Sequence, residues 1–325
     1  MFIHNKFECY ISLYLDDIAI YSASTTHLTI RINDLKTAFQ ISDLGEASFL
    51  RGLHITYTSN CIPLSQELYI CTILSQFGME NSNTISIPLP KGITLTKGTT
   101  EQPKDQVTLY QSMIGSLMYL VTGTRPDLAY KILFLAQFSS CPTEEHIKAA
   151  KHVFRYVNGT QNLGLFYPYT TTNAINVYVD ADFAGSLHTR RSTSGYIVLF
   201  NNCCISWLLK KKASVAKSTT KAEFVAMSYG TRHLRLLLKG LVDLHLHVPI
   251  AMHADNTGAN FLAVNPHINV RMKHIAVDFI ITREALEDNL FILLKVDSVN
   301  NLANICTKIL EKPAHKRILG LFGCR

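Results

Sequence analysis

Three acidic residues in the second half of the chain occur where a metal site could form. Asp180 follows an apolar run in YVDAD, Glu223 lies in STTKAEF and Asp255 lies in HADN. An acid in an otherwise apolar strand is costly unless a partner offsets its desolvation, and Mg²⁺ can do so because hard cations take oxygen ligands. Asp182 shares a strand face with Asp180 under period two. Because Asp180 directly follows the apolar run, we expect Asp180 to be the ligand and Asp182 to lie at the edge of the site or to support it. Spacing alone leaves open that these acids are unrelated surface charges.

A second acidic group, Asp16-Asp17, lies between two apolar runs in the segment YISLYLDDIAIYS. This pattern predicts a β-hairpin with the carboxylates at its turn. Adjacent acids at a turn could both approach a pair of divalent metals, whereas adjacent residues inside a regular strand point to opposite faces. On these residues alone, an ordinary solvated pair of acids in a turn is the favoured interpretation.

The elements that must position these acids follow from the apolar periodicity. In the first half we expect a hairpin over 8–24, helices over 26–40 and 67–79, strands over 48–58 and 61–66, a linker over 84–108, and helices over 112–124, 125–140 and 143–160. In the second half we expect strands over 175–185, 193–202, 204–211, 249–256 and 289–297, and helices over 218–244, 257–264, 271–287 and 301–310. Three strands followed by alternating helices and strands predict a mixed α/β domain.

The charge of the chain is unevenly distributed. Residues 1–170 carry 12 basic and 13 acidic residues, whereas residues 171–325 carry 19 and 11. A basic half suggests a polyanionic partner such as nucleic acid, and a solvated basic surface is the alternative. The eight cysteines show no CxxC spacing, and there is neither an apolar run long enough for a bilayer nor a signal peptide. We therefore expect no membrane partner and an intracellular location, in the cytoplasm or the nucleus.

The motifs resemble, in order, those of one family. YLDDIAI is similar to the YxDD box of reverse transcriptases, and DLGEASFLRGLHI is similar to a block of copia-type retrotransposon polyproteins. Eight further segments are similar to blocks of this family: YQSMIGSLMYLVTGTRPDLAY (110–130), HIKAAKHVFRYVNGTQNLGLFY (146–167), DADFAG, RRSTSGYIVLF, ISW, STTKAEF, DN and RMKHI (271–275). The chain thus resembles the C-terminal part of a copia-type polyprotein, which consists of the end of a reverse transcriptase and an RNase H domain.

The resemblance implies an α/β (α+β) organisation in several parts. Residues 1–83 would be a truncated reverse-transcriptase palm, 84–109 a linker and 110–170 a helical thumb or connection region. Residues 174–312 would form an RNase H-like domain with a mixed five-stranded sheet and flanking helices, followed by a tail over 313–325. Strands of a truncated palm would leave exposed edges, so we expect residues 1–80 to be poorly packed.

The resemblance also implies a chemistry. The family's metal ligands map onto Asp180, Glu223 and Asp255, which would hold Mg²⁺ (or Mn²⁺) for two-metal hydrolysis of RNA in RNA–DNA hybrids. Positions beside these acids or within family motifs would contact the nucleic acid, namely Ser218, Thr219, Asn256 and His274. For His274, a purely structural role is an equal alternative.

Two departures from the family pattern bear on activity. The family's fourth RNase H acid falls in a motif that reads Leu302-Ala-Asn304-Ile-Cys-Thr-Lys308 here, so that Asn304 would be a degenerate ligand without charge. Asp16 and Asp17 are the acids of an incomplete polymerase site, because the family's other catalytic acid has no counterpart in this sequence. The two hypotheses are therefore an RNase H-type nuclease without polymerase activity, or an inactive transposon remnant that at most binds nucleic acid.

Overall fold

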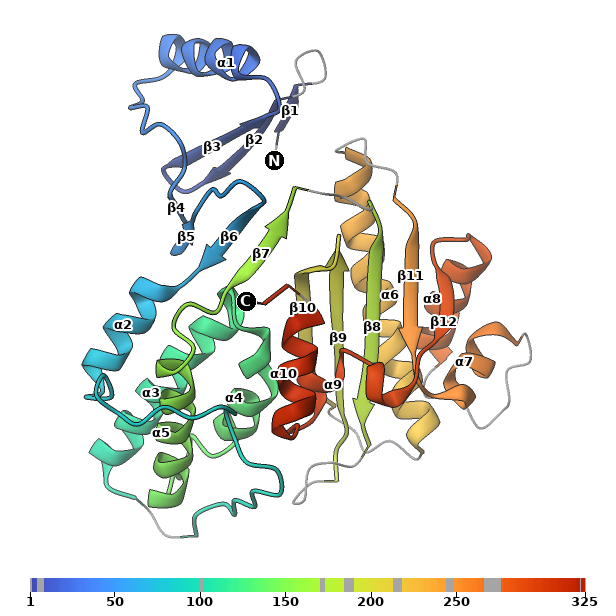
Figure 1. Cartoon of the computed structure of the whole chain (residues 1–325). Coiled ribbons are helices and arrows are strands. Elements are labelled where there is room, and N and C mark those ends of the chain that lie inside the picture. The colour runs from blue at the N-terminus through green and yellow to red at the C-terminus, as the bar shows by residue number, and fades with distance from the viewer. Residues whose placement is uncertain are drawn as a thin grey trace.

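The computed structural model describes residues 2–4, 9–99, 102–169, 173–183, 190–212, 218–243, 248–265, 276–321 and 323–324. The chain forms three β-sheets and a helical unit (Figure 1). The first sheet is antiparallel and consists of β1 (Phe2–His4), β2 (Cys9–Tyr14) and β3 (Asp17–Ser22), with α1 (Thr25–Ala38) beside it. The predicted hairpin is present, with Tyr14 paired to Asp17 at its end. Helix α1 buries no residue, so this first unit contributes little to the core.

The second sheet joins two distant parts of the sequence. It has the order β4 (Phe49–Leu50), β5 (Leu53–Ile55), β6 (Cys61–Ser65) and β7 (Leu165–Pro168). Strand β7 pairs with β6 across about a hundred residues, with Leu165 opposite Leu64. Gly164 permits this approach, because a Cβ at that position would lie 2.3 Å from the Leu64 carbonyl oxygen.

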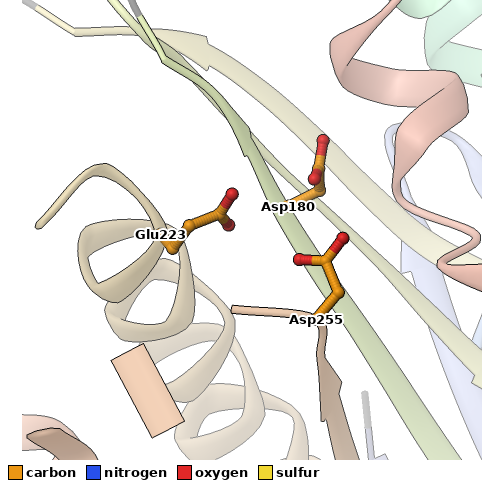
Figure 2. A group of neighbouring side chains, drawn as sticks. All are labelled: Asp180, Glu223 and Asp255. Atoms are coloured by element: carbon orange, nitrogen blue, oxygen red, sulfur yellow. The ribbon is translucent and has the colours of Figure 1, made fainter. Parts of the chain in front are cut away.

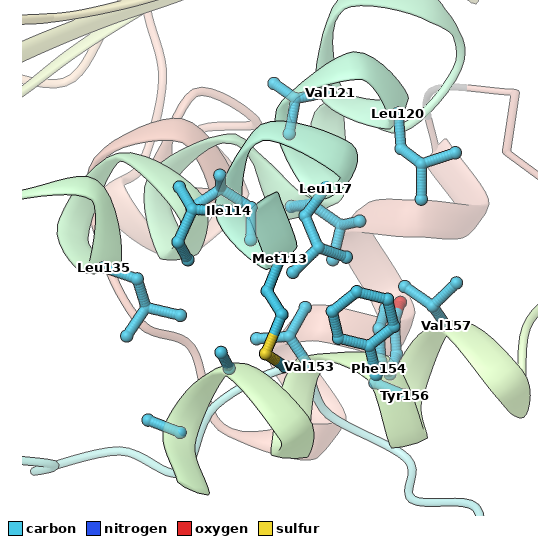
Figure 3. Packing of buried hydrophobic residues seen from close by; sticks show 14 of the residues in the cluster. Met113, Ile114, Leu117, Leu120, Val121, Leu135, Val153, Phe154, Tyr156 and Val157 are labelled. Carbon is cyan, nitrogen blue, oxygen red and sulfur yellow. The ribbon is translucent and has the colours of Figure 1, made fainter. Parts of the chain in front are cut away.

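Between these strands the chain forms a helical unit with its own core. It comprises α2 (Glu67–Gln76), α3 (Lys104–Gly123), the 3₁₀ helix η1 (Pro126–Leu128), α4 (Ala129–Ala136) and α5 (Glu144–Asn158). Figure 3 shows the buried side chains of α3 interleaved with Phe154 and Val157 of α5. Within the predicted linker, Leu89 and Leu95 are buried in the same core, and α3 begins at Lys104, earlier than expected.

An ion pair lies inside this helical unit. Arg125 and Asp127 are both fully buried, and the guanidinium donates two hydrogen bonds of 3.0 and 2.9 Å to the carboxylate. The Tyr156 hydroxyl donates to the same carboxylate, and Arg125 also donates to the Thr160 carbonyl and hydroxyl. Such a fully hydrogen-bonded pair is tolerated in a core, whereas removal of one partner would leave a buried charge unpaired.

The third sheet has five strands in the order β10-β9-β8-β11-β12. Their bounds are β8 (Ile175–Asp182), β9 (Thr193–Phe200), β10 (Cys203–Lys211), β11 (Ile250–Ala254) and β12 (Ile292–Lys295). Strands β8, β9 and β10 are antiparallel neighbours, whereas β8, β11 and β12 run parallel. The expected α/β class with a mixed five-stranded sheet is confirmed.

Helices cover both faces of this sheet. Val177 and Val179 of β8 pack in one core with residues of α6 (Thr219–Asp243), α7 (Thr257–Val264) and α8 (Ala276–Glu287). Ile197 and Leu199 of β9 face the other core, which contains α9 (Asn304–Thr307) and α10 (Lys312–Leu321). The segment expected as a tail thus contains a helix. Its backbone at Cys324 pairs with Leu165 in an isolated antiparallel β-bridge. In the part of the chain that the structure describes, no helix is long and apolar enough to cross a membrane.

Candidate metal centre

The three acids singled out in the second half come from three different elements and meet at one point (Figure 2). Asp180 lies on β8, Glu223 on the second turn of α6, and Asp255 directly after β11. Because β8 and β11 are parallel neighbours, residues near their C-terminal ends lie at the same edge of the sheet. One oxygen from each carboxylate lies within 4.8 Å of the others. Among the described residues, no other group of three His, Cys, Asp or Glu comes as close.

The starts of two helices bring Glu223 and Asp255 to this edge. Ser218 caps α6, since its hydroxyl accepts from the Lys221 backbone amide at 3.3 Å. Asn256 caps α7, since its side chain accepts from the Ala259 amide at 2.9 Å. The two helix starts are in contact, because a Cβ at Gly258 would lie 2.9 Å from the Thr220 hydroxyl. Ser218 and Asn256 therefore have a structural role in placing the acids.

The remaining predicted nucleic-acid contacts have different positions. Thr219 is exposed at the first position of α6, four residues before Glu223. His274 lies outside the described residues. Asp182 lies two residues beyond Asp180 on β8 and does not join the group of three, and burial raises the pKa of its carboxyl to about 6.

Asp180 is fully buried, and its carboxylate accepts hydrogen bonds from two side chains at the C-terminal end of α9. The Thr307 hydroxyl donates to one carboxylate oxygen, and the Lys308 ammonium donates to the other at 3.1 Å. The same ammonium donates to the Asn304 side-chain oxygen at 2.8 Å. The Asn304 amide nitrogen in turn donates to the Ser298 carbonyl at 2.6 Å. Lys308 thus donates to both Asp180 and Asn304, and both the oxygen and the nitrogen of the Asn304 side-chain amide are hydrogen-bonded.

Burial and mutual repulsion control the protonation of the cluster. Burial, together with the Asp255 charge, raises the pKa of Asp180, although Lys308 and Thr307 oppose this. Burial and the charges of Asp180 and Asp255 raise the pKa of Glu223 to about 9. Burial alone would lower the pKa of Lys308, but the neighbouring carboxylates raise it overall. The raised pKa values of Asp180 and Glu223 show that negative charge on these two buried groups is costly, and a bound cation would offset that cost. With the Asp255 oxygen beside them, they form a donor set that fits a hard divalent cation.

Residues that the motif analysis did not assign also build the site. Gly195 pairs with Asp180 across β8 and β9, and a Cβ there would lie 2.8 Å from Thr307 Cγ2. Buried Asn301 donates to the Val179 carbonyl at 2.8 Å and accepts from the Ala303 amide, which fixes α9 against β8. Gly195 stands inside an apolar strand, and a glycine there is the one sequence signal of a close backbone approach.

Asp16 and Asp17 lie apart from this centre. Asp16 is in the turn between β2 and β3, Asp17 is the first residue of β3, and both are exposed. Within the described ranges, neither acid belongs to a group of three potential metal ligands. The hairpin geometry matches the expectation, whereas a complete second metal site is not found among the described residues.

Comparison with known proteins identifies relatives of this chain. Residues 1–91 match the reverse transcriptase (RNA-dependent DNA polymerase) family. The chain is 32% identical over 316 residues, 97% of its length, to the retrovirus-related Pol polyprotein from transposon RE1 of Arabidopsis thaliana, and covers 21% of it. It is 30% identical over 221 residues, 67% of its length, to a putative transposon Ty5-1 protein of Saccharomyces cerevisiae, and covers 71% of it.

A solved structure of LC11-RNase H1, isolated from compost, aligns with 46% of this chain and 99% of its own, with a TM-score of 0.33 and 15% identity. The chain spans about a fifth of the length of the Pol polyproteins that it matches. The family resemblance read from the motifs is confirmed by these relatives. The chain belongs to the retrovirus-related Pol proteins of transposons, with a reverse-transcriptase segment in residues 1–91 and a mixed α/β unit in its second half.

Proposed function

We propose that the α/β unit is an RNase H-type nuclease that hydrolyses the RNA strand of RNA–DNA hybrids. The observation that carries this proposal is the convergence of the Asp180, Glu223 and Asp255 oxygens within 4.8 Å. These three side chains would hold Mg²⁺ or Mn²⁺. When bound, divalent metals in such sites lower the pKa of a water and stabilise the leaving oxygen of a phosphodiester.

The chain's own residues supply position and charge. Thr307 and Lys308 fix the Asp180 carboxylate, so its orientation is set before any ligand arrives. Glu223 and Asp255 are held by two capped helix starts in contact with each other. The basic excess of residues 171–325 would attract the phosphates of the hybrid, and the 2′-hydroxyl would mark the RNA strand. Thr219, exposed at the start of α6, and His274 remain candidates for such contacts.

A second function, binding of nucleic acid without cleavage, is favoured by one contact. The Lys308 ammonium lies between Asp180 and Asn304, where it already offsets part of the cluster's negative charge. An aspartate at position 304 would add a fourth carboxylate, whereas the amide adds none. A weaker negative field would lower the affinity for divalent ions and favour a non-cleaving protein.

We further infer that the reverse-transcriptase segment has no polymerase activity by itself. Asp16 and Asp17 are exposed at a hairpin turn, and in the described part of the chain no third acid lies near enough to share a metal with them. Incorporation of nucleotides by the purified chain on a primed template would contradict this inference.

The deciding experiment is cleavage of a labelled RNA–DNA hybrid by the full chain in Mg²⁺ and in Mn²⁺. The variants are Asp180→Asn, Asn304→Asp and, as a matched control on the exposed surface, Asp288→Asn. Cleavage that Asp180→Asn abolishes and Asp288→Asn preserves would establish the nuclease. Cleavage only after Asn304→Asp would assign the defect to that side chain. A hybrid that is bound but cut by no version would leave nucleic-acid binding as the function.

Metal binding can be tested without relying on activity. A cation that binds the native cluster raises the thermal midpoint, because it stabilises the folded state by mass action. We expect Mg²⁺ or Mn²⁺ to raise the midpoint of the unmodified chain and, by a larger amount, that of Asn304→Asp. The same ions should leave the midpoint of Asp180→Asn unchanged. Equal shifts in all three proteins would indicate binding elsewhere.

A further inference from the structure

A pocket of about 810 Å³ lies on the helical unit, at residues distinct from the acid cluster. Its walls come from the segment Thr84–Ile87, from the C-terminal half of α5 and from one side of α10. Helix α10 contributes Lys312, His315, Lys316 and Leu319, which share one face at helical spacing. Three segments that are far apart in sequence thus form a single concavity.

The lining of this pocket is basic. It includes Lys312, Lys316, His152 and His315, and none of the described residues that line it is acidic. Lys312 and Lys316 are exposed at the rim. Two acids next to lining residues are already paired. Glu311, which precedes Lys312, accepts from Lys91 at 2.8 Å, and Asp127, which accepts from Tyr156, is bound by Arg125. The pocket therefore presents uncompensated positive charge together with the hydroxyls of Thr84 and Ser86.

The two imidazoles in the lining each have one ring nitrogen without a hydrogen-bond partner. His315 is 2% exposed, and its Nε2 has no hydrogen-bond partner among the described residues. The buried Nε2 of His152 also has no partner, but the His152 ring is hydrogen-bonded to the Ile87 backbone. Burial, helped by the cations Lys131 and Arg125, lowers the pKa of His315 to about 4, so the neutral ring offers a donor without charge. Buried polar atoms normally have hydrogen-bond partners, so the Nε2 of His315 is suited to bind a polar group that enters the pocket.

We propose that this pocket binds a phosphate group, with Lys312 and Lys316 supplying charge and with His315 and the hydroxyls of Thr84 and Ser86 supplying donors. This phosphate would belong to the backbone of the RNA–DNA hybrid, an assignment that rests on the RNase H-type function proposed above. Lys308 at the acid cluster and Lys312 at the pocket are four residues apart, so their Cα atoms lie at most about 14 Å apart. That distance corresponds to about four nucleotides of a strand that rises about 3.4 Å per step.

The test compares two double variants of the full chain that lose equal charge. Lys312→Gln with Lys316→Gln alters the pocket, and Lys104→Gln with Lys148→Gln alters exposed lysines outside its lining. Affinity for a labelled 16-base-pair RNA–DNA hybrid is measured by anisotropy across a salt series. We expect the pocket variant to bind about tenfold more weakly and its salt slope to fall by about one, as for loss of one phosphate contact. The control should change neither quantity comparably.

A second measurement separates this proposal from the nuclease hypothesis. Inorganic phosphate is titrated into the ¹³C-histidine-labelled chain while the ring signals of His152 and His315 are followed. Movement of these signals in the unmodified chain but not in the pocket variant supports a phosphate site even if no hybrid binds. Weakening of hybrid binding only by the pocket variant identifies the backbone as the source. Equal effects of both double variants, or immobile histidine signals together with an unchanged salt slope, would overturn the proposal.

Discussion

The first and third β-sheets are built from equally apolar strands but differ in what covers them. In β8 and β9 most side chains are buried and none is exposed, and helices pack on both faces. In β2 and β3 the sole buried side chain is Cys9, and Leu13 and Tyr21 are 59% and 46% exposed. The strand pattern in the sequence is similar in the two regions, so apolar alternation predicts pairing but does not by itself predict burial.

This difference bears on where stability resides. Among the residues described from 9 to 65, few side chains are buried, and α1 has no buried residue. The expectation that residues 1–80 pack poorly fits this part, but not α2, whose Ile70, Ile73 and Leu74 are buried in the helical core. Stability should therefore depend on the helical unit and the five-stranded sheet, and little on the first hairpin.

A matched pair of phenylalanines gives the largest expected contrast. Phe224 on α6 is fully buried, whereas Phe39 after α1 is 61% exposed. Phe224→Ala should lower the free energy of unfolding by about 3–5 kcal/mol, because it leaves a cavity. Phe39→Ala should change it by less than about 0.5 kcal/mol. Urea unfolding of both variants tests this, and comparable losses would mean that the first unit is packed in solution.

Acid titration tests burial in the C-terminal part through His315. The folded-state pKa of about 4 lies below the ordinary value of 6.5, so between these values the unfolded chain binds more protons. Stability from this group is therefore complete above pH 6.5 and falls as the pH drops towards 4, by about 2–3 kcal/mol. His315→Asn should remove this component from the pH dependence of urea unfolding. An unchanged dependence in the variant would mean that the ring is not buried as described.

Two glycines with opposite surroundings give a smaller contrast. Ala at Gly195 would bring Cβ to 2.8 Å from Thr307 Cγ2 and 3.1 Å from Cys306 Cβ. We expect a loss of about 1–3 kcal/mol, with Thr307 displaced from Asp180. Gly115 on α3 meets nothing within 4 Å, so Gly115→Ala should stabilise the chain by about 0.5–1 kcal/mol. Thermal unfolding of both variants measures the signs, and stabilisation by Gly195→Ala would refute the close approach of α9.

The sequence was informative where local signals were strong. The strands of the third sheet and the long helix α6 were predicted within a few residues, because apolar alternation and a Ser cap mark their limits. The predicted approach of Asp180, Glu223 and Asp255 depended on family motifs, since spacing alone left unrelated surface charges as an alternative. The structure brings these three side chains together, and their role as ligands remains a proposal.

Other features could not be predicted because they depend on tertiary contact. The segment that forms α10 was predicted to be a tail, because its charged residues and Pro313 obscure the helical spacing of the inward-facing His315, Ile318 and Leu319. The Lys308 bridge between Asp180 and Asn304 requires α9 to pack on β8, which no local pattern indicates. The pairing of β6 with β7 is equally hidden, because the partners are separated by the whole helical unit.

The parallel pairing of β8 with β11 also has a kinetic consequence. Asp180 and Asp255 meet only when these strands pair, and the intervening β9, β10 and α6 must be made first. Contacts between such distant residues form late, because loop closure costs entropy before the contact returns stability. During synthesis, a nascent chain that has emerged only as far as α6 contains Asp180 and Glu223 without their third neighbour. The complete acid cluster is therefore a property of the finished α/β unit, and partly folded chains should bind divalent ions no better than an unfolded one.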